Sequence, residues 1–121
     1  MTQNFDVLSN FYPLWDYILV LARCKDVPNH LRYSIGEMIV KEMAEIGADL
    51  YIANKTQNQY QRRKLAVEAS MLYDKTKFKL RLFVHDPSLK NRSEILYALE
   101  SKFGKCLGGW LESMNPSHGA R

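Results

Sequence analysis

The residues best suited to do chemistry in this 121-residue chain are cations, and they gather in one segment. Residues 57–84 contain seven basic and two acidic side chains, a net charge of +5, whereas the whole chain has a formal charge of +4 at pH 7. The seven are Arg62, Arg63, Lys64, Lys75, Lys77, Lys79 and Arg81. Cations at this density are typical of a surface that neutralises the phosphates of a nucleic acid. They are equally common on a solvated helix face that confers only solubility.

Helical spacing divides part of this set between two faces. Lys77 and Arg81 are four residues apart and share one face. Lys75 and Lys79 form a second such pair, about 200° away around the helix axis. Like charges at this spacing weaken an isolated helix, so a partner rich in phosphate is one reason to retain them.

Aromatic side chains interleave with the cations, at Tyr60, Tyr73, Phe78 and Phe83. Such rings can stack on unpaired bases. Aromatic residues at helical spacing more often belong to a core or to a subunit interface, and we expect that role for most of them. Phe78 also shares a face with Met71 and Leu82, away from the main apolar stripe. A helix with two apolar faces is wholly buried or contacts another subunit, so we expect self-association.

Histidine and cysteine are placed less favourably for catalysis. His30, His85 and His118 fall at expected loop or tail positions, away from any recognisable nucleophile motif. Cys24 and Cys106 have no CxxC neighbour, which favours a role as small core residues.

A cluster of carboxylates, formed by Glu42, Glu45 and Asp49, offers a possible metal site. A solvated helix face is the more common origin of such a cluster. The sequence contains neither a Glu-x-x-His pair nor a Gly-rich phosphate loop. We therefore expect no enzymatic activity and no cofactor, and rank a metal-dependent enzyme last among the hypotheses.

The elements that must position these residues are helices. Apolar residues recurring at intervals of three and four predict four amphipathic helices, over residues 8–25, 31–54, 59–84 and 92–113. No strand alternation of comparable length occurs, and Gly (6) and Pro (4) are too scarce for a turn-rich β fold. The sequence predicts a single all-α domain over residues 1–121, most simply an antiparallel up-down four-helix bundle.

Helix starts can be predicted from capping residues. Asn10 is a candidate cap for the first helix, which would place Pro13 in the first turn. Sequences of the capping-box type occur at Ser34–Glu37, Thr56–Gln59 and Asn91–Glu94, although the second helix has an alternative start just after a proline.

Three glycines within the fourth predicted helix indicate a local feature of the structure that favours glycine over better helix formers. Gly104, Gly108 and Gly109 each cost roughly 1 kcal/mol of helix propensity relative to Ala. This cost suggests close helix packing there, or a break before Trp110.

Composition and targeting signals indicate a cytoplasmic protein with no membrane partner. Apolar residues make up 46% and charged residues 25%, ordinary values for a globular domain. Residues 1–6 lack a signal peptide, and the longest apolar stretch, Tyr17 to Ala22, is too short to span a bilayer. The chain contains only two cysteines, and this low number argues against a secreted disulfide scaffold.

Several motifs together resemble a known family. They are Tyr12-Pro13-Leu14, the stretch Pro28–Gly36 (similar to P-x-x-x-R-Y-x-L-G), the run Lys77–Phe83 and the closing Leu107-Gly108-Gly109-Trp110-Leu111. Over roughly residues 11–114, the chain resembles accessory variability determinant proteins of diversity-generating retroelements.

The resemblance implies a four-helix protomer within a barrel-shaped homopentamer. It also implies binding to a reverse transcriptase and to RNA, with DNA as an open alternative, in support of error-prone cDNA synthesis. Lys77 and Arg81 lie in the matched run, so the resemblance implies that these two residues contact the reverse transcriptase or the nucleic acid. Arg62, Arg63 and Lys64 extend the candidate site on the basis of charge.

Two alternatives stay open. Four-helix proteins encoded in intervening sequences of ribosomal RNA genes share the fold, but their R-A-x-x-S-I-x-x-N-I-A-E-G stretch is replaced here by Ile35–Val40. The other alternative is a helical protein-interaction module with no nucleic-acid role, in which the basic face contacts an acidic protein or only confers solubility.

Overall fold

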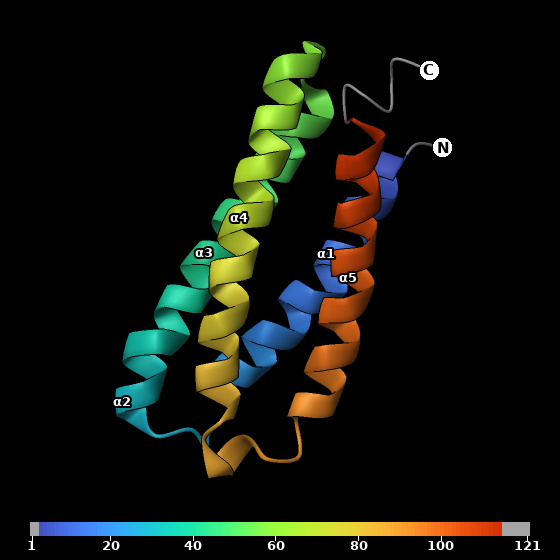
Figure 1. Cartoon of the computed structure of the whole chain (residues 1–121). Coiled ribbons are helices and arrows are strands. Elements are labelled where there is room, and N and C mark those ends of the chain that lie inside the picture. Colours follow the sequence, from blue (N-terminus) through green and yellow to red (C-terminus); the bar gives the residue numbers. More distant parts are fainter. Residues whose placement is uncertain (1–2, 115–121) are drawn as a thin grey trace.

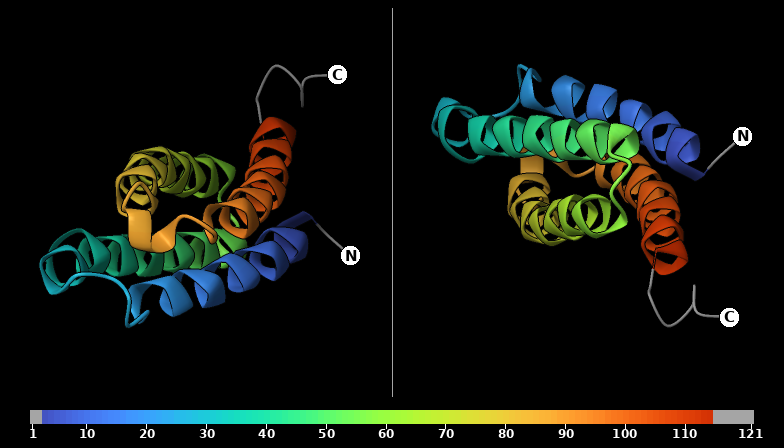
Figure 2. Two further views of the ribbon diagram at one scale, coloured as in Figure 1. Left: turned by 90° about the horizontal axis from the view of Figure 1, so that it is seen from below. Right: turned by 90° about the horizontal axis from the view of Figure 1, so that it is seen from above.

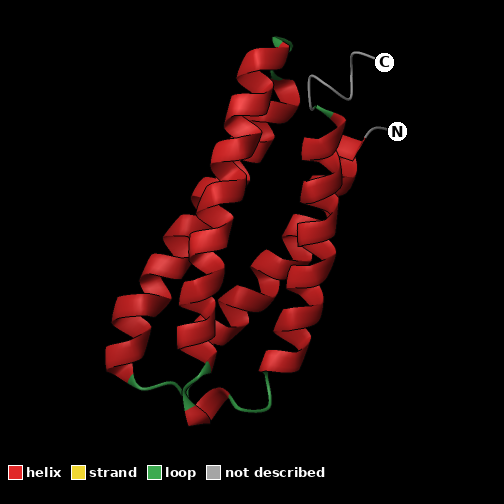
Figure 3. Ribbon diagram, viewed as in Figure 1, coloured by secondary structure: helices red, strands yellow, loops and turns green. Residues whose placement is uncertain are grey.

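The computed structural model describes residues 3–114, in which the regular structure is entirely helical (Figures 1 and 3). The four long helices are α1 (Gln3–Ala22), α3 (Glu37–Lys55), α4 (Gln59–Val84) and α5 (Ser93–Ser113). The short elements are α2 (Asn29–Leu31), the π-helical turn η1 (Arg32–Gly36) and the 3-10 turn η2 (Pro87–Leu89). No strand occurs between residues 3 and 114, so the predicted all-helical class with four long helices is confirmed.

The predicted start of the first helix is wrong. α1 begins at Gln3, so Pro13 lies inside the helix instead of in its first turn. Asn10 does not cap; its side-chain amide lies 3.1 Å from Cys106 Sγ on α5 and donates to it. The helix continues through the proline because Phe11 and Leu14 on either side are buried in the core, and tertiary packing outweighs the lost backbone hydrogen bond.

The second helix begins earlier than its capping box predicts. Pro28 stands at the N-cap position, and α2, η1 and α3 follow one another without a break. Ser34 lies within this continuous stretch, where its hydroxyl donates to the carbonyl of His30. The alternative start after Pro28 is therefore the one that the structure adopts.

The other two capping boxes are also not formed. Thr56 is the C-cap of α3 and donates to the Ile52 carbonyl at 2.7 Å. Asn58 caps α4 instead, because its side chain accepts a hydrogen bond of 3.0 Å from the Gln61 amide. α5 begins at Ser93 without a side-chain cap. The predicted bounds of α4 are nevertheless confirmed at both ends.

The long helices form two layers. α3 lies along α4 and α1 lies along α5, while α1 also contacts α3 and only a few residues join α4 to α5. Figure 2, seen along the helices, shows α1 and α3 side by side, with α4 and α5 both on one side of that pair.

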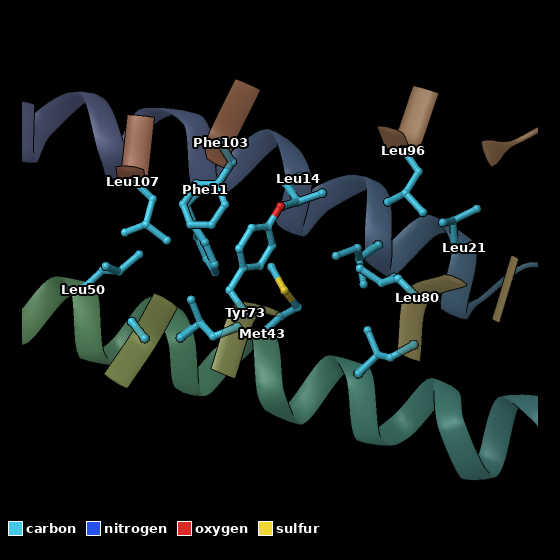
Figure 4. Packing of buried hydrophobic residues seen from close by; sticks show 14 of the residues in the cluster. Phe11, Leu14, Leu21, Met43, Leu50, Tyr73, Leu80, Leu96, Phe103 and Leu107 are labelled. Atoms are coloured by element: carbon cyan, nitrogen blue, oxygen red, sulfur yellow. The ribbon is translucent and has the colours of Figure 1, made fainter. Parts of the chain in front are cut away.

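The core lies between these layers (Figure 4). Phe103 of α5 stacks edge-on against Phe11 of α1 and Tyr73 of α4, with ring centroids 5.7 and 4.9 Å apart. Gly47 of α3 permits the close approach of α1, because a Cβ at this position would lie 2.8 Å from the Phe11 ring. Aromatic packing therefore joins three of the four long helices at one level.

Two expectations about small residues need correction. Cys24 and Cys106 pack against the core but are only half-buried. Gly104 has only a 4.0 Å neighbour in Tyr73, and a Cβ on Gly108 or Gly109 would meet nothing within 4 Å. Within the described protomer these glycines neither allow close packing nor break α5, which runs on to Ser113.

None of the helices in the described part of the chain combines the length and apolar character needed to cross a bilayer.

Candidate nucleic-acid interface

The seven candidate cations all lie on α4, and the core contacts of this helix determine where they point. Its buried positions are Ala66, Ala69, Tyr73, Thr76, Leu80, Phe83 and Val84. None of the seven basic side chains is on this buried face. The cations therefore divide among the flank toward α5, the flank toward α3 and the outward face.

Lys77 and Arg81 lie on the flank toward α5, where both are engaged. Lys77 Nζ is 3.4 Å from Asp74 Oδ1 and 4.9 Å from the centroid of the Tyr73 ring. Arg81 donates to Glu100 Oε1 at 2.7 Å, and its guanidinium lies 4.3 Å from the centroid of the Tyr97 ring. The two residues most closely tied to the family resemblance thus contribute to contacts within the protomer.

Glu100 of α5 explains the position of Arg81. Only 4% of this residue is exposed, and its second oxygen, Oε2, has no hydrogen-bond partner in the part of the chain that the structure describes. Burial raises the pKa of the Glu100 carboxyl, and the Arg81 guanidinium opposes that rise. Burial likewise raises the pKa of Tyr73, whose hydroxyl donates to the Glu100 carbonyl at 3.1 Å. Arg81 is the counter-ion of an interior carboxylate, which limits its availability to an external phosphate.

Lys79 is engaged on the opposite flank. Its ammonium forms an ion pair with Glu42 of α3, and the Thr76 hydroxyl donates to the other Glu42 oxygen at 2.8 Å. Glu42 was one of the three residues of the predicted carboxylate cluster, and it is directed toward α4. Within residues 3–114 no group of three His, Cys, Asp or Glu side chains is arranged to hold a metal ion.

The remaining carboxylates of that cluster stay near each other. Burial raises the pKa of Asp49, and the negative charges of Glu45 and Glu68 raise it further. Asp49 is therefore repelled by both of these acids.

The first turns of α4 present a different arrangement. Arg63 and Lys64 are exposed and form no ion pair in the described part of the chain, and the neighbouring Tyr60 is 77% exposed. Arg62 turns back to donate from Nε to the Thr56 carbonyl at 2.9 Å, which ties the start of α4 to the end of α3. Among the other candidates, Lys75 is likewise exposed and outside any ion pair between residues 3 and 114.

The interleaved aromatic residues divide evenly. Tyr73 and Phe83 are buried in the core, as expected for most of them, whereas Tyr60 and Phe78 are exposed. Phe78 (63% exposed) lies near Met71 (59%) and Leu82 (43%) on the outward face of the later turns. The second apolar face predicted for this helix is thus uncovered in the protomer.

A surface cavity of about 660 Å³ opens where α4 ends and α5 begins. Its lining includes Arg81, His85 and Lys90 as well as Tyr97 and Ser93. Sequence reasoning did not single out Lys90, although the Asp86-Pro87 turn indicated that the chain reverses here. The third histidine considered, His118, lies outside the described residues.

No protein-family model, curated protein or solved structure matches this chain. The case for a function therefore rests on the geometry of α4 and on the motif resemblance.

Proposed function

We propose that this protein is a non-enzymatic, nucleic-acid-binding accessory protein, and that the outward face of α4 carries the interface. The observation that supports this most strongly is the group formed by Tyr60, Arg63 and Lys64 on the first turns of α4. Its two cations have no acidic partner in the described part of the chain, and its aromatic ring is 77% exposed.

This combination suits a single strand better than a duplex. Cations neutralise successive phosphates, and an exposed ring offers a platform for an unpaired base, worth about 1–3 kcal/mol per stacked base. Lys75 extends the cationic surface about three turns further along α4. Lys77, Lys79 and Arg81 contribute less to this interface because their charges are already balanced by carboxylates.

The resemblance to accessory variability determinant proteins supplies the biological setting that we propose. The protein would act in the cytoplasm with a reverse transcriptase and its template RNA to support mutagenic cDNA synthesis. A reverse-transcriptase gene with paired variable and template repeats beside the coding sequence would support this setting.

We also infer that the four helices form an antiparallel up-down bundle that assembles further. Short connections between consecutive long helices and the pairing of α3 with α4 support the bundle. The exposed Met71, Phe78 and Leu82 support a homo-oligomer, which the resemblance suggests is a pentamer.

The test is a charge reversal at the free cations. Arg63→Glu with Lys64→Glu should weaken binding to a fluorescently labelled single-stranded RNA by at least tenfold in an anisotropy titration. The slope of log affinity against log salt should fall by about 1.4, since each phosphate contact on a single strand contributes about 0.7.

The matched control reverses two exposed lysines on α5, with Lys102→Glu and Lys105→Glu. This variant has the same net charge as the first and should retain most of the affinity. Equal loss in both variants would show that only net charge matters. Unchanged binding in the α4 variant would refute the proposed interface.

A second candidate function is a protein-interaction module, favoured by the uncovered Met71, Phe78 and Leu82. This module, or a protein of the ribosomal intervening-sequence type, would remain if the wild-type protein binds no RNA at physiological salt.

A further inference from the structure

A second cationic site lies where α1 ends and α3 begins, and its lining contains no residue of α4. A surface cavity of about 390 Å³ opens there, with Leu19, Ala22 and Val40 among its apolar lining residues. Its polar lining consists of Arg23, Arg32, Tyr33, Glu37 and Lys41. The volume falls within the range of small-molecule sites, which bind ligands on an apolar surface with a few polar groups around it.

Arg32 provides the most specific observation. One terminal nitrogen donates to the Cys24 carbonyl at the end of α1, which fixes the guanidinium against the chain. Its Nε is buried and has no hydrogen-bond partner among residues 3–114. A buried donor without an acceptor is unfavourable, so a ligand atom or an ordered water that reached this nitrogen would remove that cost.

The charges around this donor favour an anion. Arg23 and Lys41 are exposed and form no ion pair within residues 3–114. The acid among the lining residues is Glu37, which is exposed, so the cavity carries a net charge of +2 when Arg32 is counted. The three cations, of which Arg32 is held against the Cys24 carbonyl, supply positive charge suited to a phosphate group.

The local backbone holds these groups in place. Arg32 and Tyr33 open the π-helical turn η1, a type of helix that is rare and often found at functional sites. Gly36 ends this turn against the Phe83 ring, which a Cβ at this position would approach to 3.2 Å. Tyr33 is 63% exposed, so its ring is available beside the cations.

We propose that this cavity binds the phosphate-bearing part of a nucleotide. Arg23, Arg32 and Lys41 bind the phosphate, and the base packs against Tyr33 and the apolar lining. The same chemistry is offered by a free nucleotide and by one nucleotide of a single strand. This site does not depend on the interface proposed for α4.

The test is a titration followed by ¹H–¹⁵N NMR, using the Nε–H signal of Arg32 as the probe. Adenosine monophosphate should shift this signal and the backbone amides of Tyr33 and Gly36. Inorganic phosphate and adenosine, titrated separately, should each bind at least tenfold more weakly than the nucleotide. A nucleotide affinity equal to that of either part would overturn the proposal.

Charge reversal supplies the second arm. Arg23→Glu with Lys41→Glu should weaken nucleotide binding at least tenfold, whereas Lys102→Glu with Lys105→Glu should change it less than twofold. Arg32→Lys keeps the charge but removes the Nε donor, and it should also weaken binding tenfold. Because Arg32 contacts the backbone, the exposed double variant decides the outcome if Arg32→Lys does not fold. Equal effects of the two double variants would overturn the proposal.

A short single-stranded RNA, added to the wild-type protein, distinguishes the two sources of nucleotide. Shifts at Arg32 with RNA indicate a nucleotide within a strand, whereas shifts with the monophosphate alone indicate a free nucleotide; both support the site. The variant Arg63→Glu with Lys64→Glu should bind the monophosphate normally. An experiment that refutes the proposed α4 interface can therefore be distinguished from one that refutes nucleotide binding in this cavity.

Discussion

The two halves of α4 use the same residue types for different purposes. In the first turns, Arg63 and Lys64 project from the protein without acidic partners. In the later turns, Lys77, Lys79 and Arg81 all form ion pairs, two of them with carboxylates of other helices, and Lys75 is the one candidate cation there outside any ion pair between residues 3 and 114. Net charge along a helix therefore does not measure the charge that it can offer to a ligand.

The exposed apolar residues show the complementary difference. The later turns bear Met71, Phe78 and Leu82 on the outward face, whereas the large exposed side chain of the first turns is Tyr60. We infer that the first half of α4, together with Lys75, is the part available to phosphates and bases. The rest of the second half joins helices within a protomer and protomers to one another.

The largest effect should come from reversing the charge of Arg81. In Arg81→Glu the interior carboxylate of Glu100 loses its counter-ion and faces a second carboxylate. Removing one partner of a buried pair destabilises proteins by about 3–5 kcal/mol, and the partial exposure of Arg81 reduces the loss to about 2–3 kcal/mol. Urea unfolding at pH 7 measures this change.

Lys64→Glu is the matched variant in the first half of α4. Its expected change in unfolding free energy is within about 0.5 kcal/mol, because Lys64 is exposed and makes no ion pair in the described part of the chain. Similar losses in the two variants would remove the distinction between the halves.

The next effect concerns assembly. Met71→Ser with Leu82→Ser should weaken self-association by about 2 kcal/mol, roughly 30-fold, because both side chains are expected at the centre of the subunit interface. Light scattering over a range of protein concentrations measures the mass. Tyr60→Ser, in the first half, should leave the mass unchanged. An unchanged mass in the double variant would place the interface elsewhere.

The sequence predicts α4 well because its signals are local. The apolar period continues without interruption, and the Asp86-Pro87 turn ends it close to the observed end at Val84. The positions of the cations on α4 could also be predicted from the sequence of this helix alone. The ion pair of Lys77 with Asp74 spans only three residues and was also within reach of local reasoning.

The remaining ion pairs carry no local signal. Lys79 meets Glu42 across 37 residues, and Arg81 meets Glu100 across 19, so both depend on how the helices pack. Pro13 shows the same limit, because core contacts keep α1 helical where local rules predict a helix start. The π-helical turn at Arg32 likewise has no simple sequence signature.

The smallest effect is a pH dependence that tests whether burial outweighs the Arg81 charge in setting the pKa of Glu100. Burial raises the pKa of Glu100 above its ordinary value of 4.5, despite Arg81. Between these two pKa values the folded state binds more protons than the unfolded state, so this group increases stability as the pH falls. Glu100→Gln removes that contribution, whose slope is at most about 1.4 kcal/mol per pH unit.

The free energy of unfolding of wild type minus that of Glu100→Gln should therefore rise from pH 7 toward pH 5 in urea titrations. Taking the difference cancels the opposite contribution of Asp86, whose pKa is lowered by its hydrogen bonds to Ser88. A difference that stays constant with pH would mean that Arg81 and Lys77 fully offset the effect of burial on the Glu100 pKa.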